Sequence, residues 1–298
     1  AFTWDSDLRE PRLLSFKGDL FLYLAVLGEN PMDFEPQGML VSQRLGPANW
    51  SEPQWSYEPG FIPWRTKVVD GVAQMIGYVG GEKIYDDGTT ALEVRWLKTD
   101  DGYNFEPVIP GQPTVLAGGT SETDFVILDD GRLVAVGRNE KGDEGGFGSR
   151  ICRAEADAPG DWVCASDPKK YDSPLVFEHE GEVYLIGRRN VTETGDYDLG
   201  LDDMSYEDRF LEYQLTYWGT PKRCSLWQVD PSELTVSFIA DLPSAGDTCF
   251  ASILPLSEGE YEVYNYTSPL EEPDISWLTG QTGHTFIYRI PLSFVCEE

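Results

Sequence analysis

Pairs of charged or hydrogen-bonding residues recur along this chain of 298 residues, each directly before a short apolar segment. These leading pairs are Arg9/Glu10, Trp64/Arg65, Glu122/Thr123, Asp172/Ser173 and Asp247/Thr248. If Glu122, Asp172 and Asp247 met arginines in one pocket, each would shift the proton affinity of the others. One group could then stay protonated while another stayed ionised at the same pH. Cleavage of a glycosidic bond needs such groups, because one protonates the leaving oxygen and another activates water or attacks the sugar.

Other residues could bind the substrate of such a site. The candidates are Arg9, Trp64 and Arg65 from the leading pairs, and Arg138, Arg188 and Tyr266, which end a following apolar segment. Guanidinium groups would bind sugar hydroxyls or a substrate carboxylate, and the rings of Trp64 and Tyr266 could stack against a sugar face. The alternative is structural, because Asp and Arg at strand starts also bond backbone groups and pair with one another.

The segments that must position these residues have the sequence signature of β-strands. Short apolar runs are bounded by Gly, Pro, Asn and Asp, and no long stretch sustains the period of a helix. A leading residue and a turn glycine recur at one spacing, as Arg9 and Gly18, Glu122 and Gly131, and Asp172 and Gly181. The pattern indicates internal repeats, each made of a leading pair, a strand, a turn and a second strand.

Five such repeats begin near residues 9, 64, 122, 172 and 247. A period of about 50 residues with four short strands is typical of a β-propeller blade. We therefore predict an all-β fold, with residues 1–298 forming one domain, a single five-bladed β-propeller of four-stranded antiparallel blades. The outer strands are expected near residues 50–55, 105–108, 162–165, 236–242 and 292–295. Two stacked β-sandwiches are the alternative.

The propeller prediction brings the leading pairs together. Inner strands of all blades start on one face near the axis, so the five pairs should line one funnel. The fourth repeat also contains an insertion at about 191–221, rich in Asp, Glu and Tyr. We expect this insertion to be a loop that could cover one face as a lid.

The charge balance excludes several partners. The chain has 22 Lys and Arg against 52 Asp and Glu, a formal net charge of −30. Nucleic acids and anionic membrane surfaces both need a basic face, which this composition does not provide. The hydrophobic share of 41% argues against disorder. No apolar run approaches the ~20 residues of a transmembrane helix.

Metal and cofactor sites are not indicated by the sequence. His179 and His284 are the only histidines, which argues against a His-ligated metal or a Ser-His triad. The chain has no GxSxG motif and no glycine loop for phosphate. The acidic run from Asp196 to Asp203 could bind calcium, but its glycine comes one place early for an EF-hand, which favours a solvated loop. We expect no cofactor and no metal, with calcium as the alternative.

Five cysteines leave two arrangements open. Cys152 and Cys164 flank a turn, so two strands joined there could bring their thiols together, and Cys224 and Cys249 could form a second disulfide. Cys296 would then be unpaired. The alternative is five buried, reduced thiols. With the acidic surface, the cysteines favour a secreted or periplasmic protein.

The stretch from Ser121 to Arg138 resembles the sialidase pattern in which a Glu opens one strand and an Arg ends the next. The segment Arg9–Glu10–Pro11 is similar to the Arg-Ile-Pro opening of that family, and residues 99–105 are a degenerate relative of its Asp boxes. The resemblance implies Asp33 as acid/base, Arg188 as a carboxylate-binding arginine and Tyr266 as nucleophile. Sialidases have six blades, whereas five repeats are counted here.

Five blades look more like the arabinanase, xylosidase and fructosidase families, whose carboxylates open the inner strands of successive blades. This resemblance implies Glu122 as the general acid. Arg9 and the Trp64–Arg65 pair stand where the base and the auxiliary acid should open the first two blades. Asp172 and Asp247 would then have to substitute.

The leading hypothesis is a secreted, monomeric glycoside hydrolase that acts on an oligosaccharide or polysaccharide. Glu122, Asp172 and Asp247 would supply acid/base function. A non-catalytic carbohydrate-binding propeller is the first alternative. The second is a polysaccharide lyase, in which an Arg or Tyr neutralises and deprotonates a uronic acid.

Overall fold

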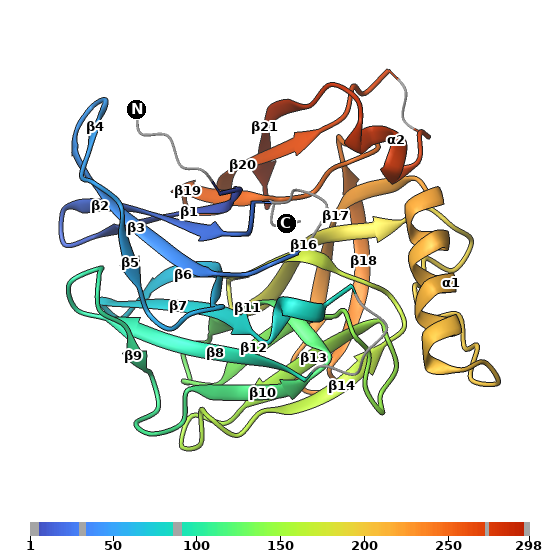
Figure 1. The fold of residues 1–298 in the computed structure, drawn as a ribbon, viewed down its shortest axis with the longest axis horizontal. Coiled ribbons are helices and arrows are strands. Elements are labelled where there is room, and N and C mark those ends of the chain that lie inside the picture. Colours follow the sequence, from blue (N-terminus) through green and yellow to red (C-terminus); the bar gives the residue numbers. More distant parts are fainter. Residues whose placement is uncertain (1–5, 30–33, 86–90, 272–273, 295–298) are drawn as a thin grey trace, which may run out of the picture. The chain divides into compact units, whose positions relative to one another are not determined.

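The computed structural model describes residues 6–29, 34–85, 91–271 and 274–294, and its strands form five antiparallel sheets (Figure 1). The first sheet contains β1 (Leu8–Phe16), β2 (Asp19–Val26), β3 (Gly38–Gly46), β4 (Asn49–Trp50) and β5 (Gln54–Ser56), which pairs with β3. The second contains β6 (Ile62–Val69), β7 (Val72–Val79), β8 (Leu92–Thr99), β9 (Glu106–Pro107) and β10 (Thr114–Gly118). The third contains β11 (Thr120–Ile127), β12 (Leu133–Asn139), β13 (Ser149–Ala154) and β14 (Val163–Asp167).

The fourth sheet contains β15 (Asp172–His179), β16 (Glu182–Asn190), β17 (Lys222–Asp230) and β18 (Thr235–Leu242). The fifth contains β19 (Ser252–Ser257), β20 (Glu260–Thr267) and β21 (Phe286–Ser293). The helical segments are η1 (Gly81–Lys83), α1 (Tyr206–Gly219) and α2 (Trp277–Gln281). The prediction of an all-β, five-bladed β-propeller is confirmed.

Contacts within the chain divide it into two compact units. Unit 1 is Ala1–Thr123 with Ala158–Trp162, and unit 2 is Asp124–Asp157 with Val163–Glu298.

Each unit has its own hydrophobic core. In β1 of unit 1, the side chains alternate between the core and the solvent, because every second residue from Arg12 to Phe16 is buried. Leu14 and Phe16 pack there with Tyr23 and Met39. In unit 2, β12, β13, β15, β16 and β17 supply a comparable aliphatic core that includes Val136, Ile151 and Leu185.

Two strand predictions need correction. Residues 105–108 contribute only the two-residue β9, while the outer strand on the main path of the second sheet is β10. Residues 292 and 293, expected on a separate outer strand, continue β21, so the fifth sheet has three strands in the described part of the chain. Both errors arise because outer strands are short and half exposed, which leaves little apolar pattern to read.

The insertion between β16 and β17 is not the irregular loop expected from the sequence. It contains α1, which begins after Ser205, whose hydroxyl accepts a hydrogen bond from the backbone N of Asp208 at 3.1 Å. Its inner face buries Phe210, Tyr213 and Tyr217, which pack with residues of unit 2. Its outer face carries exposed Leu211, Leu215 and Trp218. Apolar residues on both faces hide the helical period, which explains the error.

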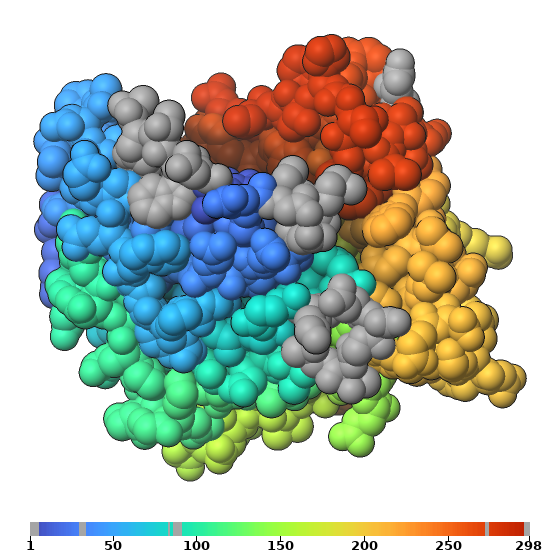
Figure 2. All heavy atoms as spheres, viewed as in Figure 1, coloured from blue at the N-terminus to red at the C-terminus, as the bar shows by residue number. Residues whose placement is uncertain are grey.

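Helix α1 therefore lies on the surface of unit 2, where it is coloured amber in Figure 2. It contacts α2, and Tyr217 packs against Trp277 of that helix with their ring centroids 5.6 Å apart. None of the helices in the described residues has the length and hydropathy needed to cross a bilayer.

Two disulfides are present. Cys152 and Cys164 lie directly opposite each other in the pairing of β13 with β14, and their sulfurs are bonded. Cys224 of β17 is bonded to Cys249. Of the two arrangements that the sequence left open, the structure has the disulfides and not the reduced thiols. Cys296 lies outside the described residues.

Candidate functional site

Three of the five leading pairs lie at irregularities in the inner strands. The pairing register shifts between Arg9 and Arg12 in β1, between Pro63 and Arg65 in β6, and between Asp172 and Leu175 in β15. A bulge breaks the alternation of a strand and re-aims the side chains beside it. Glu10 and Ser173 also have positive φ angles, of 55° and 53°. This conformation costs about 1–3 kcal/mol and is typical of functional sites.

Unit 1 brings Glu10 together with two arginines and a second carboxylate. Nη2 of Arg12 donates to Oε2 of Glu10 at 3.0 Å, and Arg12 itself is buried. Burial raises the pKa of Glu10; Arg12 opposes this rise, and the charge of Glu122 adds to it. Arg65 also lowers the pKa of Glu10, but the net shift is upward. Glu10 therefore keeps its proton to a higher pH than an ordinary glutamate.

The other predicted residues of unit 1 are placed differently. Arg9 is exposed, and its Nε donates to Oδ2 of Asp7 at 2.6 Å. Trp64 is only 2% exposed, and the guanidinium of Arg12 lies 4.6 Å from the centre of its ring. A sugar could stack on that ring face only after Arg12 moved, so a stacking role for Trp64 stays a prediction. Arg65 and Glu122 are both buried.

Unit 2 brings Asp172, Arg138 and Arg188 together. Oδ1 of Asp172, a fully buried residue, lies 3.0 Å from Nε of Arg138. Its Oδ2 lies 3.8 Å from Nη1 of Arg188, which pairs with Asp172 across β15 and β16. The hydroxyl of Tyr217, from α1, donates to the same Oδ2. Asp172 thus joins two inner-blade arginines to the inserted helix.

Arg188 links this carboxylate to the last predicted pair. Its Nε donates to the carbonyl oxygen of Thr248 at 2.6 Å, and its Nη2 lies 3.9 Å from Oδ1 of Asp247. The hydroxyl of Tyr266 donates to the same Oδ1 at 2.9 Å. Burial would lower the pKa of Arg188, but the surrounding tyrosines and aspartates raise it well above its usual value. Arg188 is therefore a permanent cation.

A second ion pair lies beside Arg138. Nζ of Lys170 is 2.7 Å from Oε2 of Glu140, and both side chains are fully buried. Nε of Arg138 pairs with the same carboxylate, and Nε2 of Gln214 donates to its other oxygen at 3.0 Å. Burial alone would raise the pKa of Glu140, but Arg138 and Lys170 lower it to about 2. Glu140 is thus ionised at every ordinary pH.

Lys222 is a further buried basic residue of unit 2. Its Nζ donates to the carbonyl oxygens of Tyr217 and Thr220, at the end of α1, and lies 3.9 Å from the centre of the Tyr217 ring. Burial lowers the pKa of Lys222 to about 6, and Arg188 adds to this effect. At neutral pH the amine is therefore largely uncharged.

Several residues of these groups were not among those predicted from the sequence. They are Arg12, Glu140, Lys170, Tyr217 and Lys222, and Glu10 appeared only as a member of a leading pair. Glu140 lies two positions after the predicted Arg138, and Lys170 lies two positions before the predicted Asp172. Their charge and their closeness in sequence to predicted residues could have indicated them. Asp33, matched to the acid/base of sialidases, lies outside the described residues.

The acidic run from Asp196 to Asp203, for which calcium binding was the alternative to a solvated loop, is engaged by protein donors. Asp198 accepts hydrogen bonds from the backbone of Phe147 at 2.8 Å and from the hydroxyl of Tyr213 at 2.8 Å. Asp202 pairs with Arg209 at 2.5 Å, and Asp196 lies 3.5 Å from Lys169. Among the described residues, no group of three or more His, Cys, Asp or Glu side chains is arranged to hold a metal ion.

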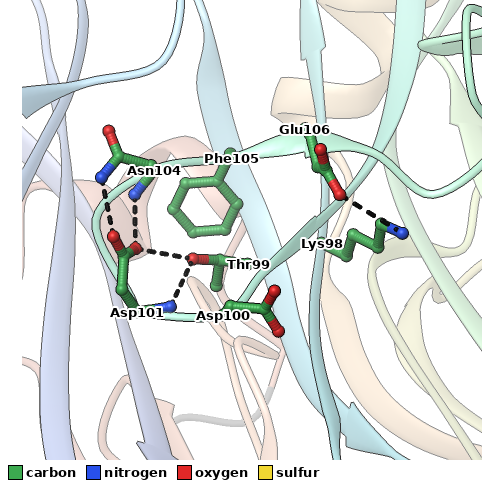
Figure 3. A pocket seen from close by; sticks show the side chains of 7 residues that line it. All are labelled: Lys98, Thr99, Asp100, Asp101, Asn104, Phe105 and Glu106. Atoms are coloured by element: carbon green, nitrogen blue, oxygen red, sulfur yellow. Dashed lines mark hydrogen bonds and ion pairs between the residues drawn. The ribbon is translucent and has the colours of Figure 1, made fainter.

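A cavity of about 340 Å³ in unit 1 is lined by residues 98–101 and 104–106 (Figure 3). Asp101 organises its rim, because Oδ1 accepts from the backbone of Tyr103 and Asn104, both at 2.8 Å. Oδ2 accepts from the side chain of Asn104 at 2.7 Å. The backbone hydrogen bond from Asn104 is the largest of the contacts that lower the pKa of Asp101 to about 2. Asp101 thus acts as a turn-forming residue.

Replacement of Asp101 by Ala is expected to lower the free energy of unfolding by about 1 kcal/mol, as loss of a helix cap does. The effect is modest because Asp101 is exposed and solvent screens its charge. The lowered pKa stabilises the fold above the ordinary aspartate pKa, so the difference should vanish as pH falls towards 2. Urea unfolding at pH 7 and pH 3 measures it, with Asp100→Ala on the same turn as control. An equal loss in both variants would contradict the assignment.

Comparisons with known proteins support the fold. No protein-family model matches the chain, and no curated protein matches its sequence. A solved structure of a protein of unknown function from Dyadobacter fermentans has a TM-score of 0.63 and 12% identity, over 97% of this chain and 77% of that one. A GH43_1 enzyme from Xanthomonas citri, solved with xylose, has a TM-score of 0.52 and 16% identity, over 97% and 87%. The GH32 β-fructofuranosidase BmSUC1 of Bombyx mori has a TM-score of 0.53 and 13% identity, over 95% and 60%. The chain therefore shares its fold with five-bladed glycosidases, as the sequence indicated.

Proposed function

We propose that this protein is a glycoside hydrolase in which Glu10 and Glu122 are the acid–base pair. The observation that carries the proposal is the raised pKa of Glu10, to which the charge of Glu122 contributes. A carboxyl group that keeps its proton beside a second carboxylate suits divided acid and base roles. Glu10 would protonate the leaving oxygen, and Glu122 would activate water or attack the sugar. Glu122, which the family resemblance implied as the general acid, is therefore assigned here as the base or nucleophile, and Glu10 is assigned as the acid.

Asp172 and Asp247 have a different role in this proposal. Oδ2 of Asp172 and Oδ1 of Asp247 each accept a hydrogen bond from a tyrosine hydroxyl and lie near Arg188, so these two oxygens are engaged by neighbouring donors. Within unit 2, we assign the two aspartates to positioning Arg138, Arg188 and Tyr266, and the binding of sugar hydroxyls by these three residues stays a prediction. In this proposal, Glu10 and Glu122 take the catalytic roles that the sequence led us to expect of these two aspartates.

The proposed substrate is an oligosaccharide or polysaccharide. The similar Xanthomonas citri enzyme was solved with xylose, and the similar Bombyx mori enzyme is a β-fructofuranosidase. The test incubates the wild-type protein with a panel of aryl glycosides and polysaccharides and identifies the products. New reducing ends without ultraviolet absorbance would support hydrolysis, whereas an absorbing, unsaturated product would indicate a lyase. Loss of turnover in Glu122→Gln would exclude a contaminating enzyme as its source.

A non-catalytic carbohydrate-binding protein is the second candidate. It is favoured by the contact of Arg12 with Glu10 and Trp64, which occupies both side chains with an internal partner. Retention by polysaccharides together with no product from any substrate would select this candidate over the hydrolase.

We also propose that the protein is a monomer in an oxidising compartment, secreted or periplasmic. The two disulfides support the compartment, because such bonds persist where thiols are not kept reduced. Fractionation of the producing cell and sedimentation at the 33.4 kDa of one chain are the tests.

A further inference from the structure

We propose that unit 1 carries a second saccharide site, on the outer edge of its first sheet, where Trp55 binds one face of a neutral sugar ring. The cavity there measures about 290 Å³ and is lined by Gln37, Gly38, Trp55, Ser56, Tyr57, Glu58 and Pro59. This volume lies just below the usual range for small-molecule sites, about 300–1,000 Å³. One or two sugar rings suit such a space better than a long ligand.

Trp55 has the exposure that a stacking platform needs. It lies on β5, opposite Leu40 of β3, and is 55% exposed. An apolar ring with a polar tip stacks well on the C–H face of a sugar. The ring lies close over Gly38, because a Cβ at residue 38 would be 3.3 Å from Cζ3 of Trp55. Gly38, with a φ of 143°, is thus required both by its conformation and by the position of the indole.

Polar groups beside the indole could orient a sugar. Oε1 of Glu58 accepts from Nε of Arg95 at 2.9 Å, and the Glu58 side chain remains 41% exposed. Its carboxylate can therefore accept a hydrogen bond from a ligand hydroxyl. Between Trp55 and Glu58 the chain turns at Tyr57, whose φ is 62°. An aromatic residue in this region is a conformational outlier, and such strain is often retained at ligand sites.

The local charge selects a neutral sugar over an acidic one. Arg95 is bonded by two carboxylates, of Glu58 and Glu93, so the three groups together carry a formal negative charge. A uronic or sialic acid would be repelled by this charge and by the net charge of −30. The chemistry therefore fits a neutral polysaccharide.

This site is separate from the acid–base pair. In the first sheet, β2 and β3 lie between β1, which carries Glu10, and β5, which carries Trp55. At about 4.8 Å between neighbouring strands, β1 and β5 are about 14 Å apart. The inference therefore holds whether or not Glu10 and Glu122 catalyse a reaction.

The test measures retention in native gels that contain arabinoxylan, galactomannan, mixed-linkage β-glucan or polygalacturonate. It uses a Glu122→Gln background, so that turnover does not consume the polymer. We expect at least one neutral polymer to retain the protein, with Trp55→Ala weakening retention about tenfold and Glu58→Gln weakening it less. Trp218→Ala, which removes another exposed tryptophan, should bind like the parent. Thermal unfolding confirms that each variant is folded.

A footprint locates the ligand directly. Hydroxyl-radical oxidation of the parent, followed by peptide mass spectrometry, should show that the retained polymer protects Trp55 and leaves Trp218 unprotected. Unchanged retention of a folded Trp55→Ala variant, or no protection of Trp55, would overturn the inference. So would preferential binding of polygalacturonate. A change in sedimentation mass on Trp55→Ala without sugar binding would instead identify the surface as a contact between copies of the chain.

Discussion

Replacement of Glu10 by Gln is expected to reduce kcat/KM on an aryl glycoside substrate about 10²- to 10⁴-fold, the usual contribution of a positioned general acid or base. The amide keeps the shape of the side chain and its contact with Arg12 through the carbonyl oxygen. It cannot donate a proton to the leaving oxygen. The loss should be smaller on substrates with an acidic leaving group, such as 2,4-dinitrophenol, because those leave without protonation.

The pH dependence of the wild-type protein follows from the same group. Glu10 has a raised pKa, so its protonated form persists above the ordinary range of a glutamate. Activity that needs this proton should fall as pH rises through the raised pKa of Glu10. The Glu10→Gln variant should lose this alkaline limb, which kcat/KM measured from pH 4 to pH 9 would show.

Glu52→Gln is the matched control for Glu10→Gln, since Glu52 is an exposed glutamate of the same unit. It should retain wild-type kcat/KM and the wild-type pH profile. Wild-type kcat/KM in a folded Glu10→Gln variant, or an alkaline limb that survives in it, would remove Glu10 from the mechanism.

The fold could be predicted because its signals are local and repeated. Turn glycines such as Gly18 and Gly181 follow their leading residues at a fixed spacing, and β18 lies where an outer strand was expected, near residues 236–242. Repetition reinforces each weak local signal, so the number of blades could be read without any knowledge of contacts. Helix α1 was not found, because it occurs once and its apolar residues lie on two faces.

The candidate site could be predicted only in part, because its electrostatics depend on contacts across blades. Asp172 and Arg188 lie in adjacent strands of one repeat, and the repeat pattern selected both. Glu140 and Lys170 form an ion pair although they are 30 positions apart in the sequence, and the segments that carry them have no periodic pattern. Likewise, nothing in the sequence indicates that Arg12 would cover Trp64 and bond Glu10. Residue type and spacing therefore locate a site more reliably than they assign roles within it.

Replacement of Glu140 by Gln is expected to lower the free energy of unfolding by about 3–5 kcal/mol at pH 7, the usual cost of removing one partner of a buried ion pair. Glu140 and Lys170 are both fully buried, and Arg138 shares the same carboxylate. Without that charge, two cations face each other in a low-dielectric interior. Because burial already lowers the pKa of Lys170, loss of its proton should relieve part of the cost at alkaline pH.

The acid dependence has a definite sign. The pKa of Glu140 falls from an ordinary 4.5 to about 2 on folding, so its contribution is complete above the unfolded value and is lost as pH falls towards 2. Wild-type and Glu140→Gln proteins should therefore converge in stability between about pH 4.5 and pH 2. Guanidinium unfolding at several pH values measures this convergence.

Glu155→Gln provides the control for the Glu140 variant, because Glu155 faces Arg153 at 3.9 Å with 61% of its side chain exposed. An exposed pair of this kind contributes about 0–1 kcal/mol. The double variant Glu140→Gln/Lys170→Met removes both buried partners and should regain part of the loss, since no unpaired lysine remains. A Glu140→Gln protein as stable as Glu155→Gln would show that the buried charges are compensated elsewhere.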